Sequence, residues 1–281
     1  RAIKLTPAND AEALAFLGWA LAKSELYFLP ETTFVWEEGA KAYARATKLK
    51  PDDAELSEAM ADAYIQLLVR PDSEIKRKEY GQMAQEAFNN LIRIRPHDAE
   101  LRFKYGRFLW GKRDDRDLSS YARAVEQFRK AVSREPQNKR YLEMLEIGLS
   151  SWQDEDISKS IRPLEEFNSY SEWAKTHRQA YAKDPRSREL LSLYDKWIAL
   201  EPNQSEWRLK VAITYRSMGQ LDNAEKSLRQ ALQVFPNDAK VYIALASLLI
   251  DANRYDEALE YFREGLARTN QDDRKTLDAV G

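Results

Sequence analysis

The sequence predicts an all-α protein built as a right-handed solenoid of about seven helix-turn-helix repeats. The main observation is a period of 34 residues, because residues 205–238 and 239–272 carry small and apolar residues at matching places. Matching pairs are Ala224 with Ala258, Leu228 with Phe262, and Ala231 with Gly265. Six of the ten prolines also share one repeat-end position. Units of this kind bury their apolar stripes against their neighbours, which produces a solenoid.

The repeat at residues 205–238 shows why each element is expected. Apolar residues recur at helical spacing in two stretches, which predicts two amphipathic helices. Gly219 lies between them and allows a turn, because glycine adopts backbone angles that other residues resist. Asp222 is placed to begin the second helix. Pro236 ends that helix, because proline lacks an amide donor and crowds the preceding turn.

These residues and their spacing resemble the tetratricopeptide repeat (TPR), a pair of antiparallel helices. The resemblance implies a superhelical solenoid whose first helices line a concave groove that holds a segment of a partner protein. Some TPR domains clamp terminal carboxylates with paired Lys and Asn residues in that groove, and this pattern is absent here. The long asparagine ladder of the glycan-transferase TPR array is absent as well.

Taken in order, the chain divides into five predicted parts. Residues 1–10 are the end of a preceding repeat, and residues 11–138 are three repeats with long inter-helix insertions. Residues 139–170 are a degenerate repeat, residues 171–272 are three regular repeats, and residues 273–281 are a tail or the start of a capping helix. In the repeat at 171–204, Leu190 and Trp197 replace the usual small residues, so we expect a more open hairpin.

Each of the first three repeats carries an insertion at the same place. The inserted segments are residues 24–33, 69–81 and 111–120, and they should emerge on one edge of the solenoid. They are either tolerated surface loops, because lengthening a loop costs little free energy, or an elaborated recognition edge.

Composition narrows the possible partners. The net charge of −2 lacks the basic excess of a nucleic-acid binder, so no nucleic-acid partner is expected. No apolar run is long enough to span a membrane, and the chain contains no cysteine for disulfide or thiol chemistry.

Nothing in the sequence argues for catalysis, a cofactor or a metal. The stretch from Gly106 to Lys112 looks like a phosphate-binding loop, but Arg113 stands where the Mg²⁺-binding hydroxyl should be and no strand precedes it. His97 and His177 share no metal-like spacing with carboxylates, so we interpret both as structural.

Extending the repeat phase predicts which residues line the groove. One row reads Ala15, Glu58, Phe103, Glu143, Lys175, Leu209 and Ile243, and another reads Trp19, Asp62, Arg107, Ile147, Gln179, Ile213 and Ser247. The predicted partner-binding residues are Trp19, Phe103, Arg107, Trp110, Lys175 and Gln179. An aromatic residue beside an arginine is typical of binding hot spots. Trp110 could equally pack beneath the segment at 111–120.

The leading functional hypothesis is a non-catalytic scaffold that binds a protein or peptide segment. The interrupted array, with Tyr-Gly-Arg-Phe-Leu at residues 105–109, also resembles the soluble domain of bacterial O-antigen ligase/polymerase-type membrane proteins. That resemblance implies a periplasmic domain which positions a glycan, a lipid-linked glycan or a partner protein. Otherwise we expect the cytoplasm, and self-association is a third possibility. Because the chain begins inside a repeat, we expect it to be part of a longer protein.

Overall fold

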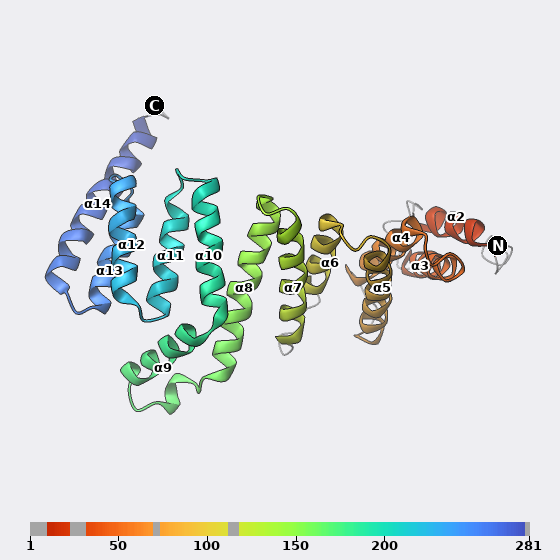
Figure 1. Cartoon of the computed structure of the whole chain (residues 1–281), viewed down its shortest axis with the longest axis horizontal. Helices are drawn as coiled ribbons and strands as arrows, with labels where there is room; N and C mark the ends of the chain where they lie inside the picture. Colours follow the sequence, from red (N-terminus) through yellow and green to blue (C-terminus); the bar gives the residue numbers. More distant parts are fainter. Residues whose placement is uncertain (1–9, 23–31, 70–73, 112–117, 279–281) are drawn as a thin grey trace. The chain divides into compact units, whose positions relative to one another are not determined.

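The computed structural model describes residues 10–22, 32–69, 74–111 and 118–278. Over these residues the chain contains 13 α-helices, one short 3-10 helix and no strand (Figure 1). The predicted all-α fold class is therefore confirmed. Residues 1–9, assigned above to the end of a preceding repeat, lie outside the described residues.

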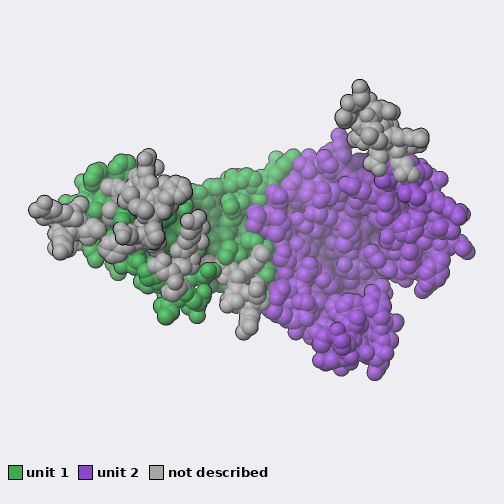
Figure 2. Space-filling view, turned by 180° about the vertical axis from the view of Figure 1, so that it is seen from behind, with its two compact units in different colours: residues 1–141 green, residues 142–281 purple. Residues whose placement is uncertain are grey.

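The chain divides into two compact units, residues 1–141 and residues 142–281 (Figure 2). The first unit contains α2 (Ala11–Ala22), α3 (Thr32–Leu49), α4 (Ala54–Val69), α5 (Glu74–Ile94), α6 (Ala99–Gly111) and α7 (Leu118–Arg134). After α8 (Lys139–Ser160), the second unit contains η1 (Leu164–Glu166), α9 (Tyr170–Lys183), α10 (Pro185–Leu200), α11 (Ser205–Ser217), α12 (Leu221–Val234), α13 (Ala239–Asp251) and α14 (Tyr255–Asp278).

The first unit consists of three hairpins, α2–α3, α4–α5 and α6–α7. A glycine lets the helices of two of these hairpins approach closely. A Cβ atom on Gly18 would lie 2.8 Å from the Tyr43 ring, and one on Gly106 would lie 2.5 Å from the Phe128 ring. Any larger residue would force the helices apart, which explains why a small residue of the first helix faces an aromatic residue of the second.

The predicted insertions are shorter than expected where the chain is described. Helix α5 begins at Glu74, so much of the segment at 69–81 is helical. Its charged residues, Glu, Lys and Arg, are good helix formers, and they extend the second helix backwards. Likewise α3 begins at Thr32 and α7 at Leu118. The rest of the three insertions falls on residues 23–31, 70–73 and 112–117, outside the described residues.

The last two hairpins, α11–α12 and α13–α14, repeat each other closely. Their shared core is made of buried small and apolar residues: Ala212, Ala224, Leu228, Ala231, Val241, Leu245, Leu248, Leu249 and Ala258. Gly219 ends the first turn with a φ of 72°, and Asn253, one period later, has a φ of 59°. Asparagine is one of the few residues besides glycine that tolerates this left-handed conformation, so both turns have the same backbone geometry.

Helix α10 pairs with α8, which differs from the predicted pairing of α10 with α9. Tyr194 Oη donates to Glu146 Oε1 at 3.1 Å, and Gln153 Nε2 donates to Ser187 Oγ at 2.7 Å. The residue numbers fall along one helix as they rise along the other, so the two helices are antiparallel neighbours (Figure 1). The segment between them, which contains η1 and α9, is therefore a fourth insertion at the turn between two paired helices.

The described part of the chain thus contains five closely packed hairpins and the more open α8–α10 pair, which side-chain hydrogen bonds connect, where the sequence predicted about seven repeats. Helix α9 cannot fold back along α10, because Asp184 alone separates the two helices and caps the start of α10. At the C-terminal end, α14 continues without a break to Asp278, so residues 273–278 extend the last helix and do not start another. None of the described helices is long and apolar enough to cross a membrane.

Candidate protein-binding surface

The first helices of the two regular hairpins, α11 and α13, lie side by side and leave apolar side chains uncovered. Ile213 is 56% exposed, Ile243 is 41% exposed and Ile250 is 43% exposed. The opposite face of α13 carries Val241 and Leu245, which are fully buried. We call the exposed side the first-helix face. Large apolar residues gathered on one exposed face are typical of a surface that a partner covers.

Charged side chains frame one end of this face. Arg216 Nε at the end of α11 donates to Asp251 Oδ2 at the end of α13, at 2.6 Å. Arg178 of α9 reaches the same carboxylate oxygen, with its Nη2 at 3.9 Å. The stem of Arg178 lies across the turn after α11, where a Cβ atom on Gly219 would be 3.3 Å from Arg178 Cβ. Three helices therefore meet at one carboxylate.

Near its middle, α11 is held by a polar cluster that includes the buried residues Glu146 and Tyr194. Lys210 Nζ donates to Glu146 Oε1 at 3.1 Å, and the same oxygen accepts the Tyr194 hydroxyl. Burial, reinforced by the Glu146 charge, raises the pKa of Tyr194, so this hydroxyl stays protonated and donates. Lys210 also lies 5.0 Å from the centre of the Trp207 ring. Its contacts are internal, so Lys210 joins α8, α10 and α11 and is a structural residue.

The first helices of the other unit, α2 and α4, expose different kinds of side chain. Phe16 and Trp19 of α2 are exposed neighbours, with ring centres 5.8 Å apart. On α4, Glu58 accepts a hydrogen bond from Lys104 Nζ of α6 at 2.9 Å. Partial burial raises the pKa of Asp62, with Lys104 opposing and Glu58 adding to the shift. Aromatic and acidic groups dominate here, whereas isoleucine and basic groups dominate the first-helix face.

The predicted partner-binding residues differ in exposure, so the structure supports a binding role for only some of them. Trp19 and Arg107 are exposed, as a binding role requires. Phe103 is only 3% exposed, because its ring packs 4.8 Å from the Tyr141 ring and 6.1 Å from the Phe128 ring. The prediction that Phe103 faces a partner is corrected: it is a core residue. Arg107 lies over its outer edge, 5.9 Å from the ring centre.

Trp110 is half-buried and meets the Tyr121 ring edge-on at 5.3 Å, which favours its packing role. Lys175 and Gln179 are exposed on α9. Because α9 is an insertion, these two residues do not continue the row of first-helix residues as the repeat phase predicted. Sequence reasoning missed Arg178, Arg216, Asp251 and Ile250. The separation of Arg216 from Asp251 by one repeat plus one residue was a usable signal, but the displacement of α9 left no signal for Arg178.

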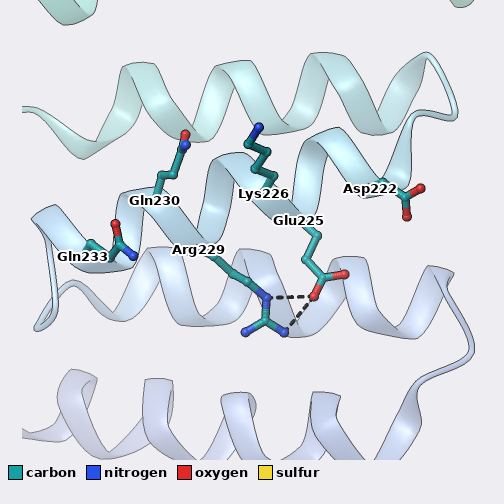
Figure 3. Close-up of a pocket in the computed structure, with 6 residues that line it drawn as sticks. All are labelled: Asp222, Glu225, Lys226, Arg229, Gln230 and Gln233. Carbon is teal, nitrogen blue, oxygen red and sulfur yellow. Dashed lines mark hydrogen bonds and ion pairs between the residues drawn. The ribbon is translucent and has the colours of Figure 1, made fainter.

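A shallow pocket of about 410 Å³ lies along the outer side of α12 (Figure 3). Its lining comes from the polar and charged residues of a single helix: Asp222, Glu225, Lys226, Arg229, Gln230 and Gln233. Arg229 Nε donates to Glu225 Oε1 at 2.8 Å, and Arg229 Nη1 donates to the Tyr261 hydroxyl at 2.9 Å. Glu225 also pairs with Arg254. These groups tie α12 to the last hairpin, so we interpret the pocket as a by-product of helix packing.

Gly106, His97 and His177, which were considered above for phosphate or metal binding, all pack against neighbouring side chains. Gly106 lies inside α6 against Phe128, which rules out a phosphate loop there. His97 Nδ1 lies 2.7 Å from Arg134 Nη2, and the His177 ring lies 4.0 Å from the Trp173 ring. Among the described residues no group of three or more His, Asp or Glu side chains is placed to hold a metal ion.

Comparison with known proteins agrees with the repeat pattern. Residues 215–275 match the tetratricopeptide repeat family model. The small glutamine-rich tetratricopeptide repeat-containing protein 2 of Mycosarcoma maydis is 29% identical over 113 residues, which span 40% of this chain and 29% of that protein.

Two solved structures are also similar. The crystal structure of MamA has a TM-score of 0.45 at 15% identity, covering 76% of this chain and 94% of that one. The structure of YrrB, described as a TPR protein with an unusual peptide-binding site, has a TM-score of 0.45 at 14% identity, covering 82% and 93%. The resemblance to the O-antigen ligase/polymerase domain stays a prediction. The described part of the chain is an array of helix hairpins, and residues 215–275 match the tetratricopeptide repeat family model.

Proposed function

We propose that the protein is a non-catalytic scaffold that binds a segment of another protein along the first-helix face. The observation that carries this proposal is the exposure of Ile213, Ile243 and Ile250 on two adjacent helices. Each of these side chains leaves 41–56% of its surface uncovered, whereas Val241 and Leu245 on the opposite face of α13 are fully buried. Burying a whole isoleucine side chain is worth about 1.5–3 kcal/mol, so covering the exposed half of each of these three contributes about 1 kcal/mol per residue to a complex.

The shape of the ligand follows from the supporting helices. The α11–α13 pair is fixed by a buried core and by two turns of the same geometry, so the exposed isoleucines have set positions. A rigid row of anchors suits an amphipathic helix or an extended segment that presents apolar side chains at matching intervals. The partner then loses conformational freedom on binding, whereas the scaffold loses little.

The test is photo-crosslinking in cells that contain the protein. A photoreactive residue replaces Ile213, and the attached material is identified by mass spectrometry. The matched control replaces Val234, which is 50% exposed but lies on the second helix of the hairpin. We expect Ile213 to capture a discrete polypeptide that Val234 does not.

The other outcomes would replace this proposal. Attached glycan or lipid-linked glycan at Ile213 would support a role in envelope polysaccharide assembly. Capture of a second copy of the same chain would support self-association. Equal capture at both positions would show that the first-helix face has no special role.

A further inference from the structure

The point where α9, α11 and α13 meet has more positive charge than its own contacts require. Arg178 and Arg216 both approach the single carboxylate of Asp251, at 3.9 Å and 2.6 Å. The Arg216 contact is a hydrogen bond, whereas the Arg178 contact is too long to be one. The two arginine side chains are 40% and 43% exposed, so both are partly accessible to solvent, and each guanidinium has five N–H donors.

The three helices that meet here also contain more basic than acidic residues. Helices α9, α11 and α13 together carry seven Lys or Arg residues and three Asp or Glu residues. This excess is local, because the whole chain has a net charge of −2. A basic surface next to exposed apolar side chains is complementary to a segment that is acidic and apolar.

Apolar anchors flank the two arginines. Ile213 precedes Arg216 by one helical turn on α11, and Ile250 is next to Asp251 on α13. Both isoleucines are exposed. Because Ile213 and Arg216 are three residues apart, they share a face of α11, and a segment that covers Ile213 also passes close to Arg216 and to Arg178, which approaches the same Asp251 oxygen.

We propose that Arg178 and Arg216 form a carboxylate-binding site for an acidic segment of the partner protein, with Ile213 and Ile250 covering that segment's apolar side chains. This inference rests on the proposed function and names its ligand chemistry. A guanidinium binds a carboxylate through paired hydrogen bonds, which fixes the position of the bound group. The site depends on the inserted helix α9, because α9 supplies Arg178.

Side-chain contacts hold α9 in place and therefore fix the position of Arg178. The Tyr181 hydroxyl donates to Asp154 Oδ1 of α8 at 2.7 Å. Asp184 fixes the junction with α10 by accepting from the Arg186 backbone N–H at 2.8 Å. Together with the contact of Arg178 on the Gly219 turn, these links hold α9 at both its middle and its C-terminal end.

The test uses fluorescence anisotropy with the full chain and two labelled helical peptides. The probe peptide has leucine on one face and glutamate elsewhere, and the comparison peptide has glutamine in place of every glutamate. The variants are Arg178→Gln and Arg216→Gln, with Arg263→Gln on α14 as the matched control at an exposed arginine. Circular dichroism checks that each variant keeps its helical content and melting temperature.

We expect the wild-type chain to bind the glutamate peptide more tightly than the glutamine peptide, and less tightly as salt rises. Each binding-site variant should weaken the glutamate peptide about tenfold and leave the glutamine peptide unchanged, because charge-assisted hydrogen bonds are strong. Arg263→Gln should change neither affinity.

Three results would overturn the site. They are wild-type affinity that does not distinguish the two peptides, no binding of the glutamate peptide at low salt, and an equal loss in Arg263→Gln. The photo-crosslinking experiment at Ile213 tests the proposed scaffold function independently of the peptide-binding measurements. A polypeptide adduct at Ile213 combined with any of these results would keep the scaffold and remove the carboxylate site.

Discussion

The two regular hairpins and the interrupted α8–α10 hairpin solve the same packing problem with very different connections. In α11–α12 and α13–α14 a left-handed residue, Gly219 or Asn253, turns the chain in the shortest way. Between α8 and α10 the chain instead makes a detour through η1 and α9. Helices α8 and α10 still pack together, because their complementary faces determine the pairing. Closing the longer loop between them adds little to the free-energy cost of folding.

The largest expected effect contrasts a regular helix with the inserted one. Ala224 is completely buried where α11 and α12 touch, so Ala224→Asp places a charge in the core. We expect a loss of about 4 kcal/mol or more in unfolding free energy, seen as unfolding of the C-terminal repeats by circular dichroism. The matched change Ala180→Asp, on the half-buried α9, should cost less than about 1 kcal/mol. An unchanged melting curve for Ala224→Asp would contradict the repeat phase.

The second prediction concerns the joint that replaces the short turn. Arg186 Nε donates to both oxygens of the buried Asp184, at 2.8 and 2.9 Å, and its guanidinium also pairs with Asp156 of α8. Arg186→Ala keeps the backbone N–H of residue 186 that donates to Asp184 but removes the guanidinium that balances this buried charge. We therefore expect a loss of about 3 kcal/mol in the free energy of unfolding, measured in urea. The exposed Arg188→Ala, on the same helix, should change stability little. Equal losses in both variants would show that this joint has no special importance.

The third prediction extends the comparison to the first unit, where an ion pair again connects successive hairpins. Glu37 of α3 contacts Lys41 at 2.9 Å and Lys76 of α5 at 2.9 Å. Burial opposes ionisation of Glu37, but the hydrogen bonds and charges of the two lysines outweigh it and lower its pKa from 4.5 to about 2. A lowered folded-state pKa stabilises the fold above the unfolded pKa, and this stability is lost as pH falls through the folded value.

Glu37→Gln should therefore cost about 2 kcal/mol at pH 7. The difference from wild type should shrink as pH falls from 4.5 towards 2. Chemical unfolding measured across this range checks the prediction, with the exposed Glu55→Gln as the control. A difference that stays constant with pH would assign the loss to packing and not to charge.

The smallest expected effect tests the equivalence of the two short turns. Gly219→Ala puts a side chain at a φ of 72° and against Arg178, so we expect a loss of about 1 kcal/mol. Asn253→Gly, at the matching position, should change stability by a few tenths of a kcal/mol in thermal unfolding. If Gly219→Ala were neutral, the turn would not require its left-handed geometry.

Periodicity was sufficient to predict the fold wherever helix partners follow each other in sequence. Ala224, Leu228 and Ala231 were placed correctly, and Ile213 and Ile243 were correctly assigned to a first-helix row. The pairing of α8 with α10 was not predicted, because residues 171–204 happen to have the length of a repeat. Phe103 was misplaced for a related reason: repeat phase gives the helix face but not what the neighbouring hairpin packs against it.

Helix α9 has a consequence for how the protein can change during evolution. None of its 14 side chains, all within the described residues, is fully buried. Substitutions along its outer side therefore leave the core intact, whereas equivalent changes in α11 or α13 disturb neighbouring hairpins. Selection can alter the chemistry that α9 presents to a partner almost independently of folding. The inserted helix thus separates the evolution of specificity from the evolution of stability.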